Sequence, residues 1–190
     1  QAKEYGRNNF KFFHEQMHAD LMEYHELERD IREALHQGQF HLAYQPKVNI
    51  RINQLQGLEA LLRWNSPTRG NVSPGNFIPV AEESGHIIPL GYWVLNEVCL
   101  TLRSWQDKGL TLVPVSVNVS ARQFQQPDFH KRVAEVLRKH SIDPSLIEIE
   151  LTEGLVMEDI DSAQRELAQL KKIGLRISID DFGTGYSCLS

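Results

Sequence analysis

The chain has 190 residues, 41% of them hydrophobic, which is enough for one sizeable domain with an appendage. Its 20 Lys and Arg against 25 Asp and Glu give a formal net charge of −5. This charge argues against nonspecific binding to a nucleic-acid backbone, which needs a basic face. No apolar run approaches the ~18 residues of a membrane span, and no signal peptide is visible. Cys99 and Cys188 lack metal-ligand or disulfide spacing, so we expect a reduced, cytoplasmic protein.

The first segment, residues 1–37, is polar and charged, with helical spacing of its apolar residues, and predicts a helix that Gly38 ends. Beyond it the pattern changes. Strands are expected at 40–48, 57–64, 113–119, 147–151 and 176–180. Helices are expected near 90–108, from Pro127 onward, and from about 159 to 174. Strands that alternate with helices predict parallel pairing.

Each expected strand has one apolar face and one polar face, because successive side chains point to opposite sides. In 57–64, for example, Leu58, Ala60 and Leu62 alternate with Glu59 and Arg63. An antiparallel sheet with its polar face in water would show the same alternation. Because the connections are helical, we expect the apolar faces to pack beneath helices. The polar faces would then line the inside of a parallel α/β barrel, with a site at the C-terminal strand ends.

Oxygen-bearing side chains lie near the C-terminal ends of four expected strands. They are Glu59, Asn118, Glu150 and Asp180, with Asp181 next to the last. Converging carboxylates repel each other unless a cation joins them, and an all-oxygen donor set favours Mg²⁺, Mn²⁺ or Ca²⁺ over zinc. Shared carboxylates can hold two metals, an arrangement suited to phosphodiester hydrolysis. The alternative, that each acid is separately salt-bridged or solvated, stays open here.

From about Phe40 to Ser190 the chain closely resembles an EAL domain, the cyclic-di-GMP phosphodiesterase module of bacterial signalling. The segments that carry the resemblance are "YQP", "EALLRW", "SPGNFIPVAEESG", "LGYWVL", "VNVSARQF", "IEIELTE" and "IDDFGTGYS". The tripeptide "EAL" also occurs at 33–35, where we expect Glu33 to be a solvated helix residue. Only Glu59 lies on a strand with the right neighbours.

The resemblance implies a role for eight residues. Ligands of the first metal are matched by Glu59, Asn118, Glu150 and Asp180, and a ligand of the second metal by Asp181. Contacts to the dinucleotide are matched by Gln45 and Arg63. Glu153 matches a glutamate that holds the "DDFGTGYS" loop, which in the family couples dimerisation to metal binding. Glu59, Asp181 and Glu153 are the residues that we expect to be catalytically essential.

The resemblance also implies a TIM-like (β/α) barrel whose first strand is antiparallel, of which we expect about the first five strands here. The implied reaction is hydrolysis of cyclic-di-GMP to linear pGpG by a water activated at a two-metal Mg²⁺ or Mn²⁺ site, in a homodimer. The alternative function is a non-catalytic EAL module that binds cyclic-di-GMP as a receptor.

For the domain organisation, residues 1–16 resemble the tail of a GGDEF domain, 17–37 form a connector helix and 38–190 form the EAL domain. We expect this domain to be incomplete at its C-terminus, because the family's catalytic lysine is absent. The chain alone should then have no meaningful turnover, and a longer parent would carry an upstream GGDEF or sensor domain and any attachment to the inner membrane.

One short motif points elsewhere. The stretch "HEQMH", His14 to His18, fits the H-E-x-x-H pattern of zinc peptidases. The stretch lies in a charged helix, and no third zinc ligand is identified. We therefore favour a connector helix over a zinc peptidase site.

Overall fold

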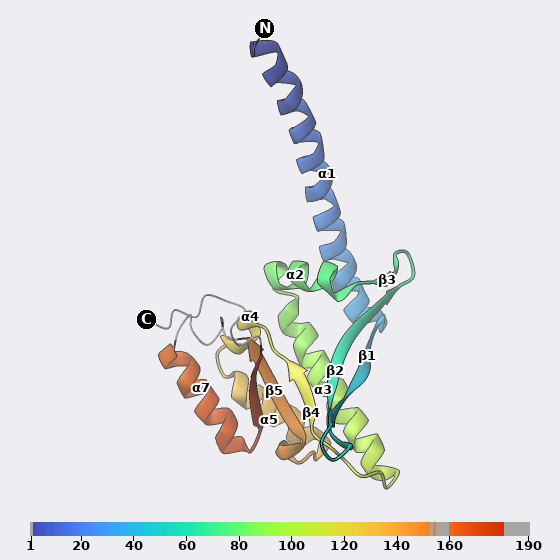
Figure 1. Cartoon of the computed structure of the whole chain (residues 1–190), viewed down its shortest axis with the longest axis vertical. Coiled ribbons are helices and arrows are strands. Elements are labelled where there is room, and N and C mark those ends of the chain that lie inside the picture. Colours follow the sequence, from blue (N-terminus) through green and yellow to red (C-terminus); the bar gives the residue numbers. More distant parts are fainter. Residues whose placement is uncertain (1, 153, 155–159, 181–190) are drawn as a thin grey trace.

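The structure is a computed structural model. It describes the backbone of residues 2–152, 154 and 160–180, and the side chains of these residues except 2–16 and 180. One long helix leads into a mixed sheet with helices packed against it (Figure 1).

The five predicted strands have the predicted topology, and one short strand, β3, was not predicted. Its strands are β1 (Phe40–Asn49), β2 (Gln54–Ser66), β3 (Gly70–Val72), β4 (Val115–Asn118), β5 (Ile147–Thr152) and β6 (Arg176–Asp180). They run in the order β1-β2-β4-β5-β6, with β3 paired to β2. The β1–β2 pair is antiparallel, whereas β2, β4, β5 and β6 are parallel. This arrangement confirms a partial TIM-like barrel with an antiparallel first strand.

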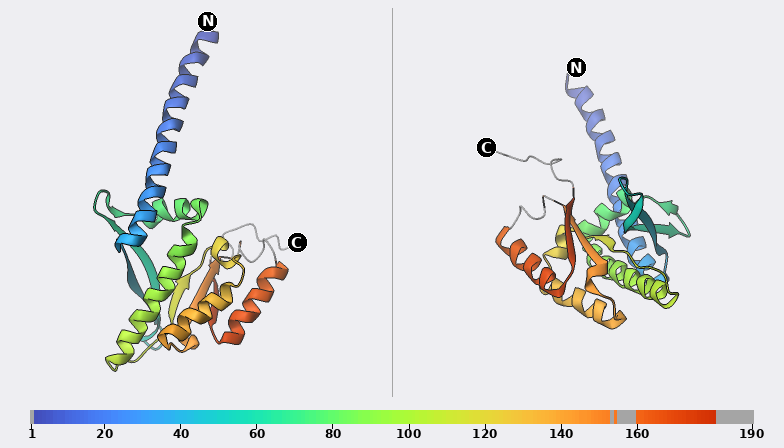
Figure 2. Two further views of the ribbon diagram at one scale, coloured as in Figure 1. Left: turned by 180° about the vertical axis from the view of Figure 1, so that it is seen from behind. Right: turned by 60° about the horizontal axis from the view of Figure 1, so that its bottom comes forward.

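Helix α1 leads into β1, and the other helices connect the parallel strands. They are α1 (Ala2–Gln37), α2 (Pro74–Ser84), α3 (Ile87–Asp107), α4 (Ala121–Phe124), α5 (Phe129–His140), the 3₁₀ turn η1 (Pro144–Leu146) and α7 (Ile160–Ile173). In the view from behind, α3, α5 and α7 lie along one face of the sheet (Figure 2). None of the helices in the described ranges combines the length and the apolar composition needed to cross a membrane.

Two helices, α2 and α4, were not predicted. The start signal of α2 was present, because Ser73 stands at the N-cap and Pro74 at the first helical position. Pro79 inside the segment obscured its helical pattern. The short helix α4 is stabilised by a capping box, in which the Ser120 hydroxyl accepts from the Gln123 backbone and the Gln123 side chain accepts from the Ser120 backbone.

The apolar faces of the strands are buried under the helices, as predicted. Val115, Val117, Ile147 and Ile149 are at most 2% exposed and form one core with α3, α5 and α7. A second core lies under the last turns of α1, where Ile31 packs with the fully buried aromatic residues of β2 and α2. Burial of this size holds a helix in place far more strongly than helix propensity does.

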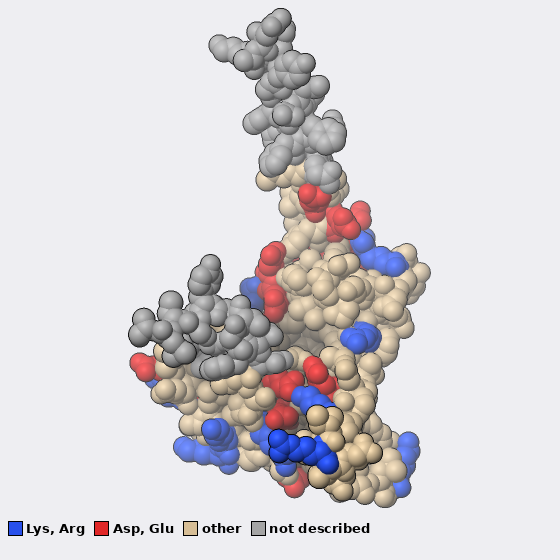
Figure 3. Space-filling model, in the orientation of Figure 1, with Lys and Arg blue, Asp and Glu red and all other residues tan. Residues whose placement is uncertain are grey.

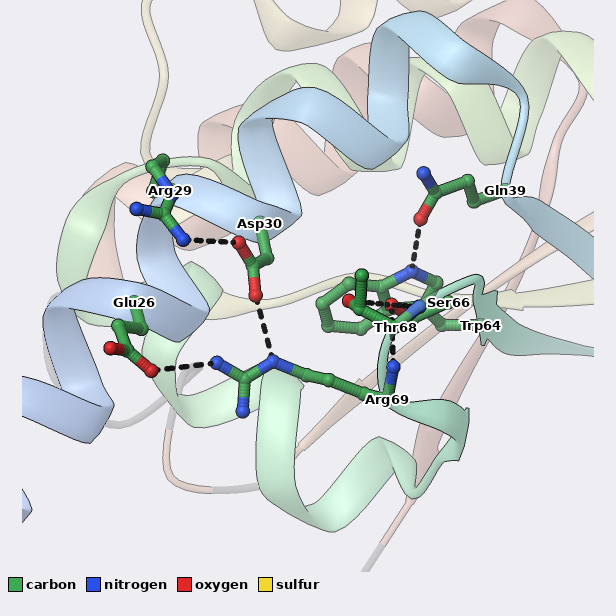
Figure 4. Close-up of polar contacts among 8 residues, drawn as sticks. All are labelled: Glu26, Arg29, Asp30, Gln39, Trp64, Ser66, Thr68 and Arg69. Carbon is green, nitrogen blue, oxygen red and sulfur yellow. Dashed lines mark hydrogen bonds and ion pairs between the residues drawn. The ribbon is translucent and has the colours of Figure 1, made fainter.

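An ion-pair network fastens the outer side of α1 to the turn between β2 and β3 (Figure 4). Arg69 on this turn donates to Asp30 at 2.7 Å and lies 3.5 Å from Glu26, and Arg29 also reaches Asp30. Burial alone would raise the pKa of the Asp30 carboxyl, but the hydrogen bonds from Arg69 and Arg29 outweigh it and hold this pKa below its usual value. The network therefore favours ionised Asp30.

Substituting Asp30→Asn should lower the free energy of unfolding by about 1 kcal/mol at pH 7, since it removes the anion between two arginines. A lowered native pKa gives stability that is present above the unfolded value of about 3.9 and is lost as pH falls through the native value. The difference from wild type should therefore shrink below about pH 3.9 in urea unfolding. Asp107→Asn, in the more exposed Arg103 pair, is the control and should cost less. An Asp30 variant as stable as wild type at pH 7 would contradict this expectation.

A close approach between α3 and α4 requires glycine at position 91. A Cβ built on Gly91 would lie 1.6 Å from Nε2 of Gln123, the residue that closes the capping box of α4. Gly91→Ala must therefore expel the Gln123 side chain, and we expect a loss of about 1–3 kcal/mol in stability by chemical denaturation.

Gly75→Ala is the matched control, because its Cβ would meet only the Ser73 hydroxyl at 3.8 Å. Adding Gln123→Ala to the Gly91 variant should recover part of the loss, since it removes the group that clashes. Additive effects of the two substitutions would show that this contact does not matter.

Candidate functional site

The register of the parallel strands brings the predicted polar residues to one face. Glu59 of β2 pairs with Ser116 of β4, and Asn118, two residues further along β4, pairs with Glu150 of β5. Since side chains repeat their direction every two residues, Glu59, Asn118 and Glu150 point to the same side of the sheet. On the face of the molecule that Figure 3 presents, acidic side chains gather in a hollow, with basic side chains beside them.

A direct contact joins two of these residues, and the third lies on the next strand. The Asn118 side-chain nitrogen Nδ2 donates to Oε1 of Glu59 at 2.8 Å. Glu150 follows on the neighbouring strand and is only 6% exposed. A carboxylate buried to this degree needs a cation or several hydrogen bonds to stay ionised. The structure thus brings three of the predicted ligands together from three strands.

The other predicted residues are described less fully. Asp180 is the last residue of β6, and its backbone pairs with Thr152, two positions beyond Glu150. Its side chain, together with Asp181 and Glu153, lies outside the described residues. Among the described residues there is no group of three or more His, Cys, Asp or Glu that could hold a metal. The predicted ligand set is therefore only partly visible.

The predicted substrate residues lie on the same strands. Gln45 of β1 is exposed and pairs directly with Glu59. Arg63, four residues beyond Glu59, donates from Nη1 to the carbonyl of Leu62 at 2.9 Å. A cavity of about 280 Å³ opens here between β2, α2, α3 and the end of β4, and Arg63, Asn118 and Glu150 line it. Burial raises the pKa of Glu82 on the α2 side of this cavity.

Lys47 is a site residue that the sequence reasoning missed. Its Nζ donates to the Ser116 hydroxyl at 2.8 Å and forms an ion pair with Oε1 of Glu150. Burial alone would lower the pKa of Lys47, but the hydrogen bond and charge of Glu150, aided by Glu148, raise it above its usual value. The signal was present in "YQPKV", where Lys47 follows Gln45 by two residues and so shares its face.

Strand β4 ends at Asn118, and the segment that follows it is fixed at two points. The Arg122 guanidinium contacts the backbone oxygens of Glu82 and Glu83 at the end of α2, the latter at 2.7 Å. Both carbonyls belong to the last turn of α2, where the helical hydrogen bonds run out, and that of Glu82 also accepts from the Gly85 backbone N–H at 3.2 Å. Gln123 closes the α4 capping box against α3. The position of Asn118 thus depends on contacts with α2 and α3.

These residues fit a hard divalent cation. Glu59, Asn118 and Glu150 offer only oxygen ligands, from side chains that already lie in contact or on adjacent strands. Carboxylate and amide oxygens are the donors that Mg²⁺ and Mn²⁺ take. The other "EAL" tripeptide, at 33–35, lies on α1. Its Glu33 is exposed on this helix, as expected.

Comparison with known proteins agrees with this geometry. The sequence model of the EAL domain matches residues 28–190. The chain is 44% identical over 188 residues to the bifunctional diguanylate cyclase/cyclic di-GMP phosphodiesterase MucR of Pseudomonas aeruginosa, covering 99% of this chain and 27% of that protein. It is 41% identical over 189 residues to the cyclic di-GMP phosphodiesterase PdeR of Escherichia coli, covering 100% of this chain and 28% of that protein.

The solved structure of the MucR phosphodiesterase in complex with c-di-GMP matches with a TM-score of 0.81 at 44% identity, over 85% of this chain and 66% of that chain. The chain spans little more than a quarter of the length of the two curated relatives. The family match, residues 28–190, includes the whole described sheet with its candidate ligands. The chain therefore belongs to the EAL-domain family.

Proposed function

We propose that the protein carrying this chain hydrolyses cyclic-di-GMP to linear pGpG in a reaction that depends on Mg²⁺ or Mn²⁺. The observation that carries the proposal is the contact of Asn118 with Glu59 beside the buried Glu150. The relatives named as cyclic-di-GMP phosphodiesterases support the substrate, as does the related structure solved with c-di-GMP.

In this proposal Glu59, Asn118, Glu150 and Asp180 hold one cation, and Asp181 belongs to the second. Bound cations of this kind supply a nucleophilic water at neutral pH and offset the charge on a phosphodiester. Three of these residues, Glu59, Asn118 and Glu150, would hold the cation with side chains that three adjacent strands keep in register. The preorganised carboxylates thus need little rearrangement when the cations bind.

Gln45 and Arg63 would orient the dinucleotide. Gln45 lies across from Glu59 on the neighbouring strand, and Arg63 lines the cavity next to Asn118. An arginine at this place offers planar, charged hydrogen-bond donors that suit a phosphate or a guanine edge. The apolar wall of the cavity, from α2 and α3, would exclude water from one side of the ligand.

The remaining assignments extend the same proposal. Glu153 would hold the loop that begins with Asp180 and Asp181 and couple it to a homodimer interface. Residues 1–16 would end a GGDEF domain, and the bifunctional name of the relative MucR supports such a neighbour. Residues 17–37 would connect the two domains in the bacterial cytoplasm, where a soluble nucleotide messenger is available.

Glu59→Gln should lower cyclic-di-GMP turnover at least 100-fold in the full-length protein, because the amide removes one anionic ligand but keeps the side-chain volume. Production of pGpG, separated by chromatography with Mn²⁺ present, measures the effect. Glu33→Gln is a matched control. It makes the same change in the other "EAL" tripeptide, at an exposed position of α1, and should leave turnover unchanged.

Normal turnover by the Glu59 variant would disprove the proposed site. Tight binding of cyclic-di-GMP by the wild-type protein without production of pGpG would instead assign the module to the non-catalytic receptors.

A further inference from the structure

Lys47 supplies the positive charge beneath the candidate metal site. Its Nζ contacts two groups from different strands, the Ser116 hydroxyl of β4 at 2.8 Å and the Glu150 carboxylate of β5. Ser116 is 1% exposed and donates its own proton to Oε2 of Glu148 at 2.7 Å. The hydroxyl can therefore accept from Lys47 while it donates to Glu148.

This chain of contacts links two carboxylates to a single cation. Glu148 and Glu150 are two residues apart on β5, so they share a face and repel each other. Lys47 pairs directly with Glu150 and reaches Glu148 through Ser116. The Lys47 side chain is 38% exposed, so water screens the pair in part.

The contacts form the layer next to the proposed ligands. Ser116 precedes Asn118 by two residues, and Glu148 precedes Glu150 by two, so both lie one step further from the C-terminal strand ends. Glu150 belongs to both layers, because Lys47 uses its Oε1 and a carboxylate offers about four lone-pair sites over its two oxygens. Glu150 can thus keep Lys47 and ligate a cation.

We propose that Lys47 is a positioning residue that acts as a resident counter-ion: it holds Glu150 in place when no metal is bound and, by the same charge, limits how tightly the site binds a divalent cation. The inference rests on the proposed metal site. Without a metal, loss of Lys47 leaves a buried carboxylate without its cation, which destabilises a protein. With a metal, the same loss removes a like charge close to the dication, which strengthens its binding.

The test is Lys47→Met, which keeps most of the length and removes the charge. The midpoint of thermal unfolding in EDTA should fall by several degrees. Affinity for Mn²⁺, measured by electron paramagnetic resonance or calorimetry without substrate, should rise about tenfold, and the thermal shift on adding Mn²⁺ should exceed that of wild type. A purely structural lysine would lower the midpoint without tightening Mn²⁺ binding.

Two further variants separate charge from other effects. Lys131→Met removes the same charge from an exposed pair with Asp128 and should leave Mn²⁺ affinity unchanged. Lys47→Gln is neutral but keeps hydrogen-bond donors, so it should also tighten Mn²⁺ binding, with a smaller loss of thermal stability.

Unchanged or weaker Mn²⁺ binding by the Lys47 variants, with binding by wild type intact, would overturn the inference and leave the proposed function standing. Failure of both Lys47 variants to fold would overturn it as well, because the lysine would then be needed for the fold itself. No Mn²⁺ binding by wild type would overturn both the inference and the proposed metal site.

Discussion

The even register between parallel strands is the constraint on which the site depends. Glu59 pairs with Ser116 and Asn118 pairs with Glu150, so each polar residue on one strand meets a polar residue on the next. A slip of one residue would turn Asn118 into the helix-covered core and expose Val117 in its place. The apolar faces of β4 and β5 are almost fully buried, so such a slip would cost most of the core. Core packing therefore fixes the geometry of the site.

The site also depends on elements that contribute no ligand. Arg122 ties the loop after β4 to the end of α2, and Gln123 fits against α3 only because Gly91 has no side chain. These contacts anchor α4, which begins three residues after Asn118. On the other side of the body, Arg69 and the second core fasten α1 to β2, the strand that carries Glu59. Through these contacts α1 is fastened to a strand of the candidate site (Figure 1).

Charge balance links the fold to the proposed chemistry. A face with several carboxylates is unstable unless cations offset them. In this chain one such cation, Lys47, comes from the antiparallel first strand. The inverted strand thus places both Gln45 and Lys47 on the inner face, one beside the proposed ligands and one beneath them. Its contribution to the site is as direct as that of the parallel strands.

The resemblance to EAL domains implied the antiparallel first strand. The sequence pattern by itself determined the parallel pairing of the later strands, the buried faces, and the face on which Glu59, Asn118 and Glu150 meet. It could do so because a period of two and helical connections leave few arrangements for such strands. Only the tertiary structure showed the contacts of Lys47, the ion pairs of Arg69 with α1, and the contacts of Arg122 and Gln123 with α2 and α3. These depend on side chains that are up to 103 residues apart in sequence. Local pattern carries no information on such contacts, because the packing of whole elements decides which long side chains meet.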